Sequence, residues 1–317
     1  MDLLCSENER ECRAYADQVI LKDDRVLEGL LRTEERYTPS TSYFRTVQKE
    51  ITTEMRDIVA DWMLEVCVEQ TQQEEVFLLA TNYLDRFLSV CSVPKTCLQL
   101  LGTACLLLAS KLRQSQNTLL SADMLVQYTD NSITHDQLLD FEWLVLTKLK
   151  WELSAVTAHD FLPHLLERLP LVACDLHAVR RHAHTYIALC ARDYKFCRYL
   201  PSMIAASSIA AALNGLGWTT KSGFSLSQLL DSLQAITSTE RDYLQVCLDQ
   251  IEGMLSAVAP VSDAAGACGV TTSGSNPATS NRPSADHAAA SSSSPSADKM
   301  HEAGKAGTPT DVWDIHF

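Results

Sequence analysis

The chain has 317 residues, which is long enough for two domains of ordinary size. Its formal net charge is −14, from 26 Lys and Arg against 40 Asp and Glu. This balance argues against a nucleic-acid ligand, whose phosphates require a basic surface, and against an anionic membrane. No apolar run reaches the roughly 20 residues of a membrane span. The N-terminus lacks the positive region and apolar core of a signal peptide, so we expect an intracellular protein.

The first half of the chain predicts a helical bundle. After a polar, irregular stretch over residues 1–20, apolar residues recur at helical spacing from 22 to 37. Five further helices are predicted over residues 54–69, 74–89, 97–113, 119–129 and 135–150. The third of these is apolar nearly all round between Leu98 and Ala109. A helix without a polar face must be surrounded by others, so we expect the block to wrap around it.

The second half repeats this plan more loosely. Helices are predicted over residues 157–168, 175–195, 201–214, 225–235 and 239–257. The third again carries small residues and begins at Pro201, a favoured first residue of a helix. Two five-helix blocks, each with a buried third helix, indicate an internal duplication. Because no alternating strand pattern is longer than a few residues, the predicted fold is all-α.

The composition changes after Leu255. Residues 258–317 are rich in Ala, Ser, Gly, Pro and Thr. Such a segment cannot bury enough apolar surface to offset the entropy lost on ordering, so we expect it to be disordered. The predicted organisation is a flexible N-terminus over residues 1–21, a first repeat over 22–152, a second repeat over 153–257 and a disordered tail over 258–317.

The eleven cysteines include no C-x-x-C pair. Four of them lie inside apolar helical patterns, where a free thiol behaves as a small hydrophobe: Cys67, Cys105, Cys190 and Cys247. His182 and His184 suggest a metal site, but two residues at this spacing on a helix point about 200° apart. We therefore predict buried thiols, no metal site, no cofactor and no catalytic residue.

One stretch carries a specific family resemblance. Residues 55–66 are M-R-D-I-V-A-D-W-M-L-E-V, with large apolar residues on one helical face, and closely resemble the first helix of the cyclin box. Other segments are similar to D-type cyclins: N-Y-L-D-R-F-L at 82–88, the apolar helix ending at Lys111, Y-T-D-N-S-I at 128–133, K-L-K-W at 148–151, H-D-F at 159–161 and P-S-M-I at 201–204. The two ends, L-L-C-S-E at 3–7 and T-P-T-D-V at 308–312, favour the D type. The tail most resembles the third D-type paralogue.

The resemblance implies a regulatory subunit that activates a cyclin-dependent kinase and contributes no catalytic group. In that family the first repeat packs against the mobile C-helix of the kinase and helps to order its activation loop. The complex would phosphorylate retinoblastoma-type pocket proteins at the G1/S transition, with the protein in nucleus and cytoplasm.

Two charged residues match the pair that cyclins present to the kinase, Lys111 and Glu142. The alternative is an internal ion pair at a helix end, worth roughly 0–1 kcal/mol if exposed. The loop after Lys111 departs from the family pattern. Gln114 stands where D-type cyclins usually have Glu, and the loop is about two residues longer, which puts a kinase contact near Gln114 in doubt.

Seven residues match the cyclin patch that docks R-x-L peptides of substrates and of kinase inhibitor proteins. They are Met55, Ile58, Val59, Trp62, Glu65, Leu98 and Gln99. Such a patch offers an apolar groove for the Leu, with an acid and an amide at its rim for the Arg and for backbone groups. The alternative is that all the apolar members belong to the core.

Two short motifs lie near the ends of the chain. Leu3, Cys5 and Glu7 form L-x-C-x-E, the motif that binds retinoblastoma-type pocket proteins, and in an extended chain these three side chains share one face. Thr308 precedes a proline in a stretch that resembles the D-type degradation signal. A phosphate there would be recognised by a ubiquitin-ligase adaptor. The alternatives are a chance match and an unused Thr-Pro.

Two other protein classes compete with this interpretation. A transcription factor with the same double repeat, like the general initiation factor, should carry a zinc ribbon and a basic DNA-binding face. An enzyme should carry a phosphate loop, a nucleophile elbow or a metal motif. The sequence contains none of these features. Co-purification with a kinase, with a promoter complex or with neither distinguishes the three classes.

Overall fold

The computed structural model describes residues 16–114, 118–171 and 174–258. Within these ranges the regular elements are all helices and no strand is present, which confirms the all-α prediction. None of the described helices has the length and apolar character needed to cross a membrane.

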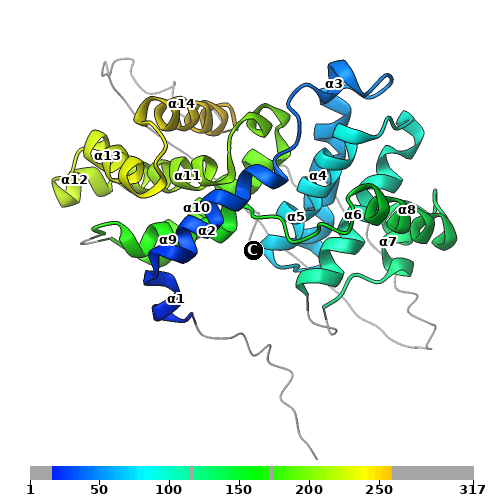
Figure 1. Ribbon diagram of the computed structural model, residues 1–317, viewed down its shortest axis with the longest axis horizontal. Helices are drawn as coiled ribbons and strands as arrows, with labels where there is room; N and C mark the ends of the chain where they lie inside the picture. The colour runs from blue at the N-terminus through cyan, green and yellow to red at the C-terminus, as the bar shows by residue number, and fades with distance from the viewer. Residues whose placement is uncertain (1–15, 115–117, 172–173, 259–317) are drawn as a thin grey trace, which may run out of the picture. The chain divides into compact units, whose positions relative to one another are not determined.

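The first repeat is a bundle of five helices, one of which lies at its centre (Figure 1). The five are α4 (Thr53–Glu69), α5 (Glu74–Val90), α6 (Leu98–Arg113), α7 (Ala122–Tyr128) and α8 (His135–Lys148). Helix α6 contacts each of the other four and is buried without interruption from Leu100 to Ser110. The prediction of a central apolar helix is therefore confirmed.

The second repeat has the same plan around α11. Its helices are α9 (Ala158–Arg168), α10 (Leu176–Arg192), α11 (Pro201–Gly215), α13 (Leu226–Thr237) and α14 (Arg241–Val258), and α11 contacts the other four. A short helix that the sequence did not predict, α12 (Trp218–Ser222), precedes α13. Its Trp218 side chain is buried, and Gly217 and Gly223 flank it at φ of 66° and 76°. Glycine adopts this left-handed conformation without steric cost, so the helix can be short.

Side-chain caps fix where several helices begin. The Thr52 hydroxyl accepts a hydrogen bond from the Met55 N–H at the start of α4. Thr134 with Gln137, and Ser225 with Gln228, form reciprocal capping boxes at the starts of α8 and α13. These bonds satisfy N–H groups that lack a partner in the first helical turn.

The N-terminal helices differ from the prediction. Helix α1 (Gln18–Lys22) begins inside the stretch expected to be irregular, and it packs on α9. The segment predicted as one helix from 22 to 37 is α2 (Asp24–Glu34) followed by a 3-10 turn, η1 (Glu35–Tyr37). Helix α2 contacts α9 and α11 of the second repeat, although the sequence assigned it to the first.

A buried carboxylate holds α2 against the second repeat. Glu34 Oε2 accepts the Ser202 N–H at 2.8 Å, and Glu34 Oε1 accepts the Ser202 hydroxyl at 2.8 Å. Ser202 lies in the first turn of α11, whose unpaired N–H groups favour a negative charge. Burial nevertheless raises the pKa of Glu34, and the two Ser202 hydrogen bonds only partly oppose it.

The four cysteines predicted to be buried are buried. Cys67, Cys105, Cys190 and Cys247 are each at most 1% exposed. Burial raises the pKa of Cys67 to about 12 and that of Cys247 to about 11. The thiolate is the reactive form, so these thiols act as core groups rather than nucleophiles.

Candidate functional site

The predicted kinase-binding pair comes together where α6 leaves the core. Lys111 Nζ donates a hydrogen bond to Glu142 Oε1 of α8 at 2.6 Å. The Lys111 side chain is 44% exposed and that of Glu142 is 12% exposed. The buried part of α6 ends one residue earlier, at Ser110. The pair therefore presents a lysine to solvent at the end of the central helix.

Exposed apolar side chains accompany this ion pair. Leu112 follows Lys111 and is 44% exposed, and Leu139 lies one helical turn before Glu142 and is 39% exposed. Trp143, 63% exposed, contacts Trp151 edge to face with ring centroids 5.8 Å apart. Exposed apolar residues that neighbour a charged pair along their helices are typical of protein-binding surfaces.

Gln114 forms a hydrogen bond within its own loop. It caps the C-terminus of α6, and its Oε1 accepts a hydrogen bond from the Thr118 hydroxyl at 3.0 Å. The residue at which the sequence departs from the D-type pattern therefore has a structural partner within the chain.

The seven docking-patch residues lie on α4 and at the start of α6. Ile58 is 67% exposed, whereas Leu98 is only 4% exposed. The other five are partly buried: Met55, Val59, Trp62, Glu65 and Gln99. Helices α4 and α6 approach closely at Gly102, where an added Cβ atom would lie only 2.8 Å from Val59 Cγ1. Leu98 thus lies in the core and Ile58 at the surface, and the docking role of the patch stays a prediction.

The rim of this patch is acidic. Asp61 forms an ion pair with Arg192 of α10. The pKa of Glu65 is raised by partial burial and by the nearby charge of Asp61, while Arg192 opposes the shift. A cationic side chain bound beside Glu65 would relieve this unfavourable environment, as the Arg of an R-x-L peptide would.

A buried polar network that was not predicted from the sequence lies behind the patch. Arg56, the second residue of the cyclin-box stretch, is 1% exposed and pairs with Asp85 of α5. Its Nη1 also donates to the Arg192 carbonyl at 2.6 Å. Asp85 accepts a further hydrogen bond from the Tyr43 hydroxyl at 2.9 Å. The available signal was an acid among the mostly apolar residues 76–88 of α5, which calls for a buried partner.

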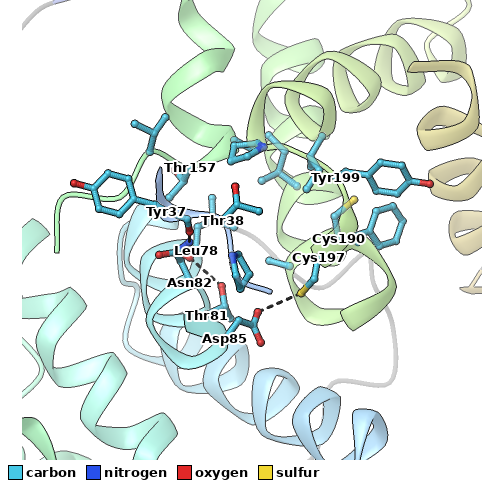
Figure 2. A pocket seen from close by; sticks show the side chains of 18 of the residues that line it. Tyr37, Thr38, Leu78, Thr81, Asn82, Asp85, Thr157, Cys190, Cys197 and Tyr199 are labelled. Carbon is cyan, nitrogen blue, oxygen red and sulfur yellow. Dashed lines mark hydrogen bonds between the residues drawn. The ribbon is translucent and has the colours of Figure 1, made fainter. Parts of the chain in front are cut away.

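A cavity of about 110 Å³ lies beside this network (Figure 2). Residues of both repeats line it, among them Asn82, Ile187 and Tyr199. Figure 2 shows Cys197 next to Asp85. The Cys197 Sγ lies 3.4 Å from Asp85 Oδ2, and burial raises the pKa of this thiol well above its ordinary value. The volume is well below the roughly 300–1,000 Å³ of a typical small-molecule pocket.

The two terminal motifs fall outside the described residues. Leu3, Cys5 and Glu7 precede residue 16, and Thr308 follows residue 258.

Comparison with known families gives two adjacent matches. The family "Cyclin, N-terminal domain" matches residues 25–154, and the family "Cyclin, C-terminal domain" matches residues 156–265. Together they span most of the described chain.

Individual relatives agree with these matches. The chain is 47% identical to G1/S-specific cyclin-D2 of Xenopus laevis over 321 aligned residues, covering 100% of both chains. It is 53% identical to human G1/S-specific cyclin-D3 over 256 residues, covering 80% of this chain and 86% of the human one. A viral cyclin from herpesvirus saimiri has a similar fold, with a TM-score of 0.64 at 24% identity over 73% of this chain and 97% of the viral one. Second and third paralogues both match, so the assignment of the tail to the third stays a prediction.

Proposed function

Because the chain belongs to the cyclin family, and within it to the D-type cyclins, we propose that it binds and activates a cyclin-dependent kinase without contributing a catalytic group. The first repeat would pack against the C-helix of the kinase. That position would bring the C-helix Glu to the β3 Lys and help to order the activation loop. An interface of this kind typically buries on the order of 2,000 Å² or more.

The observation that carries the proposal is the Lys111–Glu142 pair with its exposed apolar neighbours. A charged pair flanked by Leu112 and Leu139 offers the mixture of hydrophobic contact and fixed charge that partner surfaces use. The effect of the chain would then be measurable only as activity of the partner kinase.

A charge swap tests this proposal. Lys111→Glu should weaken kinase binding at least about tenfold, because it places like charges at the interface. The double variant Lys111→Glu with Glu142→Lys restores the internal ion pair but leaves both signs reversed toward the kinase. It should therefore stay impaired in binding and in kinase activation, while its thermal melt returns to that of the wild type.

The control is Lys221→Glu, the same reversal at an exposed lysine of the second repeat. Binding should be unchanged in this variant. Full binding by the swapped double variant would show that the pair serves only the fold, and the proposed role of Lys111 and Glu142 would be wrong.

Three further contacts complete the proposal. The patch on α4 and α6 would dock R-x-L peptides of substrates and of kinase inhibitor proteins. The L-x-C-x-E segment would bind retinoblastoma-type pocket proteins directly, which would make them preferred substrates at the G1/S transition. Phosphorylated Thr308 would be bound by a ubiquitin-ligase adaptor, and the protein would move between nucleus and cytoplasm.

A further inference from the structure

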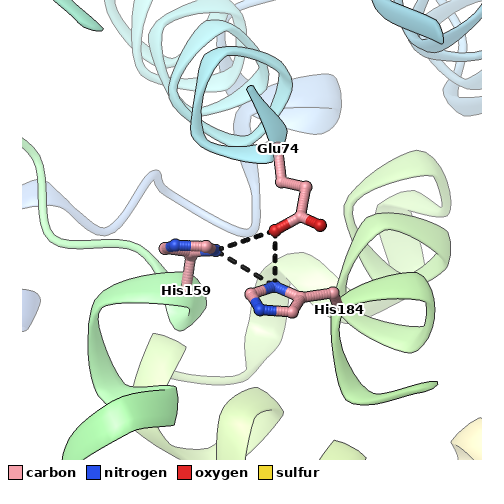
Figure 3. Close-up of side chains that lie close together, drawn as sticks. All are labelled: Glu74, His159 and His184. Atoms are coloured by element: carbon pink, nitrogen blue, oxygen red, sulfur yellow. Dashed lines mark hydrogen bonds and ion pairs between the residues drawn. The ribbon is translucent and has the colours of Figure 1, made fainter. Parts of the chain in front are cut away.

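Three side chains from separate helices meet at the junction of the two repeats. Glu74 is the first residue of α5, His159 lies in the first turn of α9, and His184 lies in the middle of α10 (Figure 3). Figure 3 shows the Glu74 carboxylate directed at both imidazoles. The three side chains are 28%, 22% and 11% exposed, so the cluster is largely shielded from water.

The ligand atoms have the spacing of a metal site. His184 Nδ1 lies 2.9 Å from Glu74 Oε2, the two Nδ1 atoms are 3.1 Å apart, and His159 Nδ1 lies 3.6 Å from Glu74 Oε2. Tetrahedral Zn²⁺ with bonds of about 2.0–2.1 Å to His nitrogen and carboxylate oxygen requires ligand atoms about 3.3–3.4 Å apart. The three measured distances fall on both sides of this value.

A second carboxylate orients one of the histidines. Glu75 Oε1 lies 3.1 Å from His159 Nε2, and its other oxygen is 3.9 Å from Arg113 Nη1. A hydrogen bond from the Nε2 proton to Glu75 leaves the lone pair of His159 on Nδ1, which faces Glu74 and His184. A zinc-binding histidine usually donates its other ring N–H to a carboxylate in this way.

The geometry points to a binding site for one divalent transition-metal ion, of the Zn²⁺ class, formed by Glu74 Oε2, His159 Nδ1 and His184 Nδ1. Two imidazole nitrogens with one carboxylate oxygen suit zinc better than the oxygen-preferring Mg²⁺ or Ca²⁺. Three protein ligands leave a fourth position for water. The ion would link α5 of the first repeat to α9 and α10 of the second, so its binding would stabilise the junction between repeats.

The site is independent of the pair that the sequence suggested. His182 contacts Tyr186 on its own helix, with ring centroids 6.1 Å apart, and does not join the cluster of His184. His182 therefore lies apart from the cluster, in which the partners of His184 come from other helices.

Zinc titration of the purified full-length chain tests the site. Affinity is measured by competition with a chromophoric chelator, and the ligand atoms are identified by X-ray absorption at the zinc edge. We expect one ion with a shell of nitrogen and oxygen at about 2.0–2.1 Å, in contrast to the 2.3 Å of sulfur that cysteine binding would give. Zinc should also raise the melting temperature, because it binds the folded state.

Variants show whether zinc binds at this site or at other histidines. His184→Gln and the isosteric Glu74→Gln should each remove the nitrogen and oxygen site and the zinc-dependent rise in melting temperature. Glu75→Gln should weaken binding by roughly 10–100-fold, as expected for a residue that positions a ligand. The control is His177→Gln, the same substitution at an exposed residue of α10, and it should bind zinc as the wild type does.

Circular dichroism shows whether His184→Gln and Glu74→Gln fold. If one of these two variants does not fold, zinc binding by the other tests the site. The absence of zinc binding, a sulfur-only shell, or binding unchanged in both His184→Gln and Glu74→Gln would overturn the proposal.

Discussion

Arg56 and Asp85 form a buried bidentate ion pair. Arg56 Nε lies 2.9 Å from Asp85 Oδ1, and Arg56 Nη2 lies 2.7 Å from Asp85 Oδ2. Burial alone would lower the pKa of Arg56, but the charge of Asp85 raises it well above its ordinary value. The pair joins α4 to α5, and the bond from Arg56 to the Arg192 carbonyl extends it to the second repeat.

Removing this acid should therefore leave the buried cation with only its longer ion pair to Asp57, in which Arg56 Nη1 lies 3.3 Å from Asp57 Oδ1. We expect Asp85→Ala to lower the free energy of unfolding by about 3–5 kcal/mol, measured by urea denaturation. The control Asp140→Ala removes an exposed acid of α8 and should stay within about 0.5 kcal/mol of the wild type. A loss below about 1 kcal/mol for Asp85→Ala would contradict the structural role of the pair.

Thr308→Ala should lengthen the half-life of the protein in cycling cells and raise its nuclear fraction. Phosphorylation would add about −1.5 to −2 charges and three strong acceptors, which an Arg-lined adaptor can bind. The matched control is Ser294→Ala, which alters a Ser-Pro dipeptide elsewhere in the tail. Decay after cycloheximide and nuclear staining that both match the wild type would show that Thr308 is not the signal.

The L-x-C-x-E motif should act independently of kinase binding. Cys5→Gly with Glu7→Gln should abolish direct binding to a retinoblastoma-type pocket protein in a kinase-free pull-down, while kinase binding stays unchanged. Leu4→Ala with Ser6→Ala alters the two intervening residues, which face the other way in an extended chain, and should keep pocket binding. Retained binding by the first double variant would refute the motif's role.

Periodicity predicted the helices well because it reflects burial along a single helix. The predicted range 97–113 agrees with α6 to one residue, since apolar residues cover nearly its whole surface. Helix α12 was missed because four of its five residues, after Trp218, are polar or charged. The association of α2 with the second repeat was missed for another reason. It depends on the Glu34–Ser202 contact, which joins residues 168 positions apart.

The candidate sites likewise depend on packing between helices, which the periodicity of one helix does not reveal. Helical spacing placed Met55, Ile58, Val59 and Trp62 on one face, but it could not show how far each is covered by the neighbouring helix. Likewise, the cluster of Glu74, His159 and His184 depends on how α5, α9 and α10 pack. The local pair of histidines on α10 carries no information about partners on other helices, so no metal site was predicted there.

The exposure of Ile58 gives the docking patch its sharpest test. Because Ile58 is 67% exposed, Ile58→Asp should leave the fold and the melting temperature unchanged. Trp62→Ala is a poorer probe, since Trp62 packs partly against the core and its loss would also lower stability.

We expect Ile58→Asp to lower kcat/KM for an R-x-L substrate at least about tenfold, since burying such a side chain contributes about 1.5–3 kcal/mol. A short peptide without the motif should be phosphorylated by the variant complex at the wild-type rate. Val246→Asp, the same kind of change at a 56% exposed position of α14, should leave kcat/KM for both substrates unchanged. An equal loss for both substrates in the Ile58 variant would place the defect in kinase activation rather than in docking.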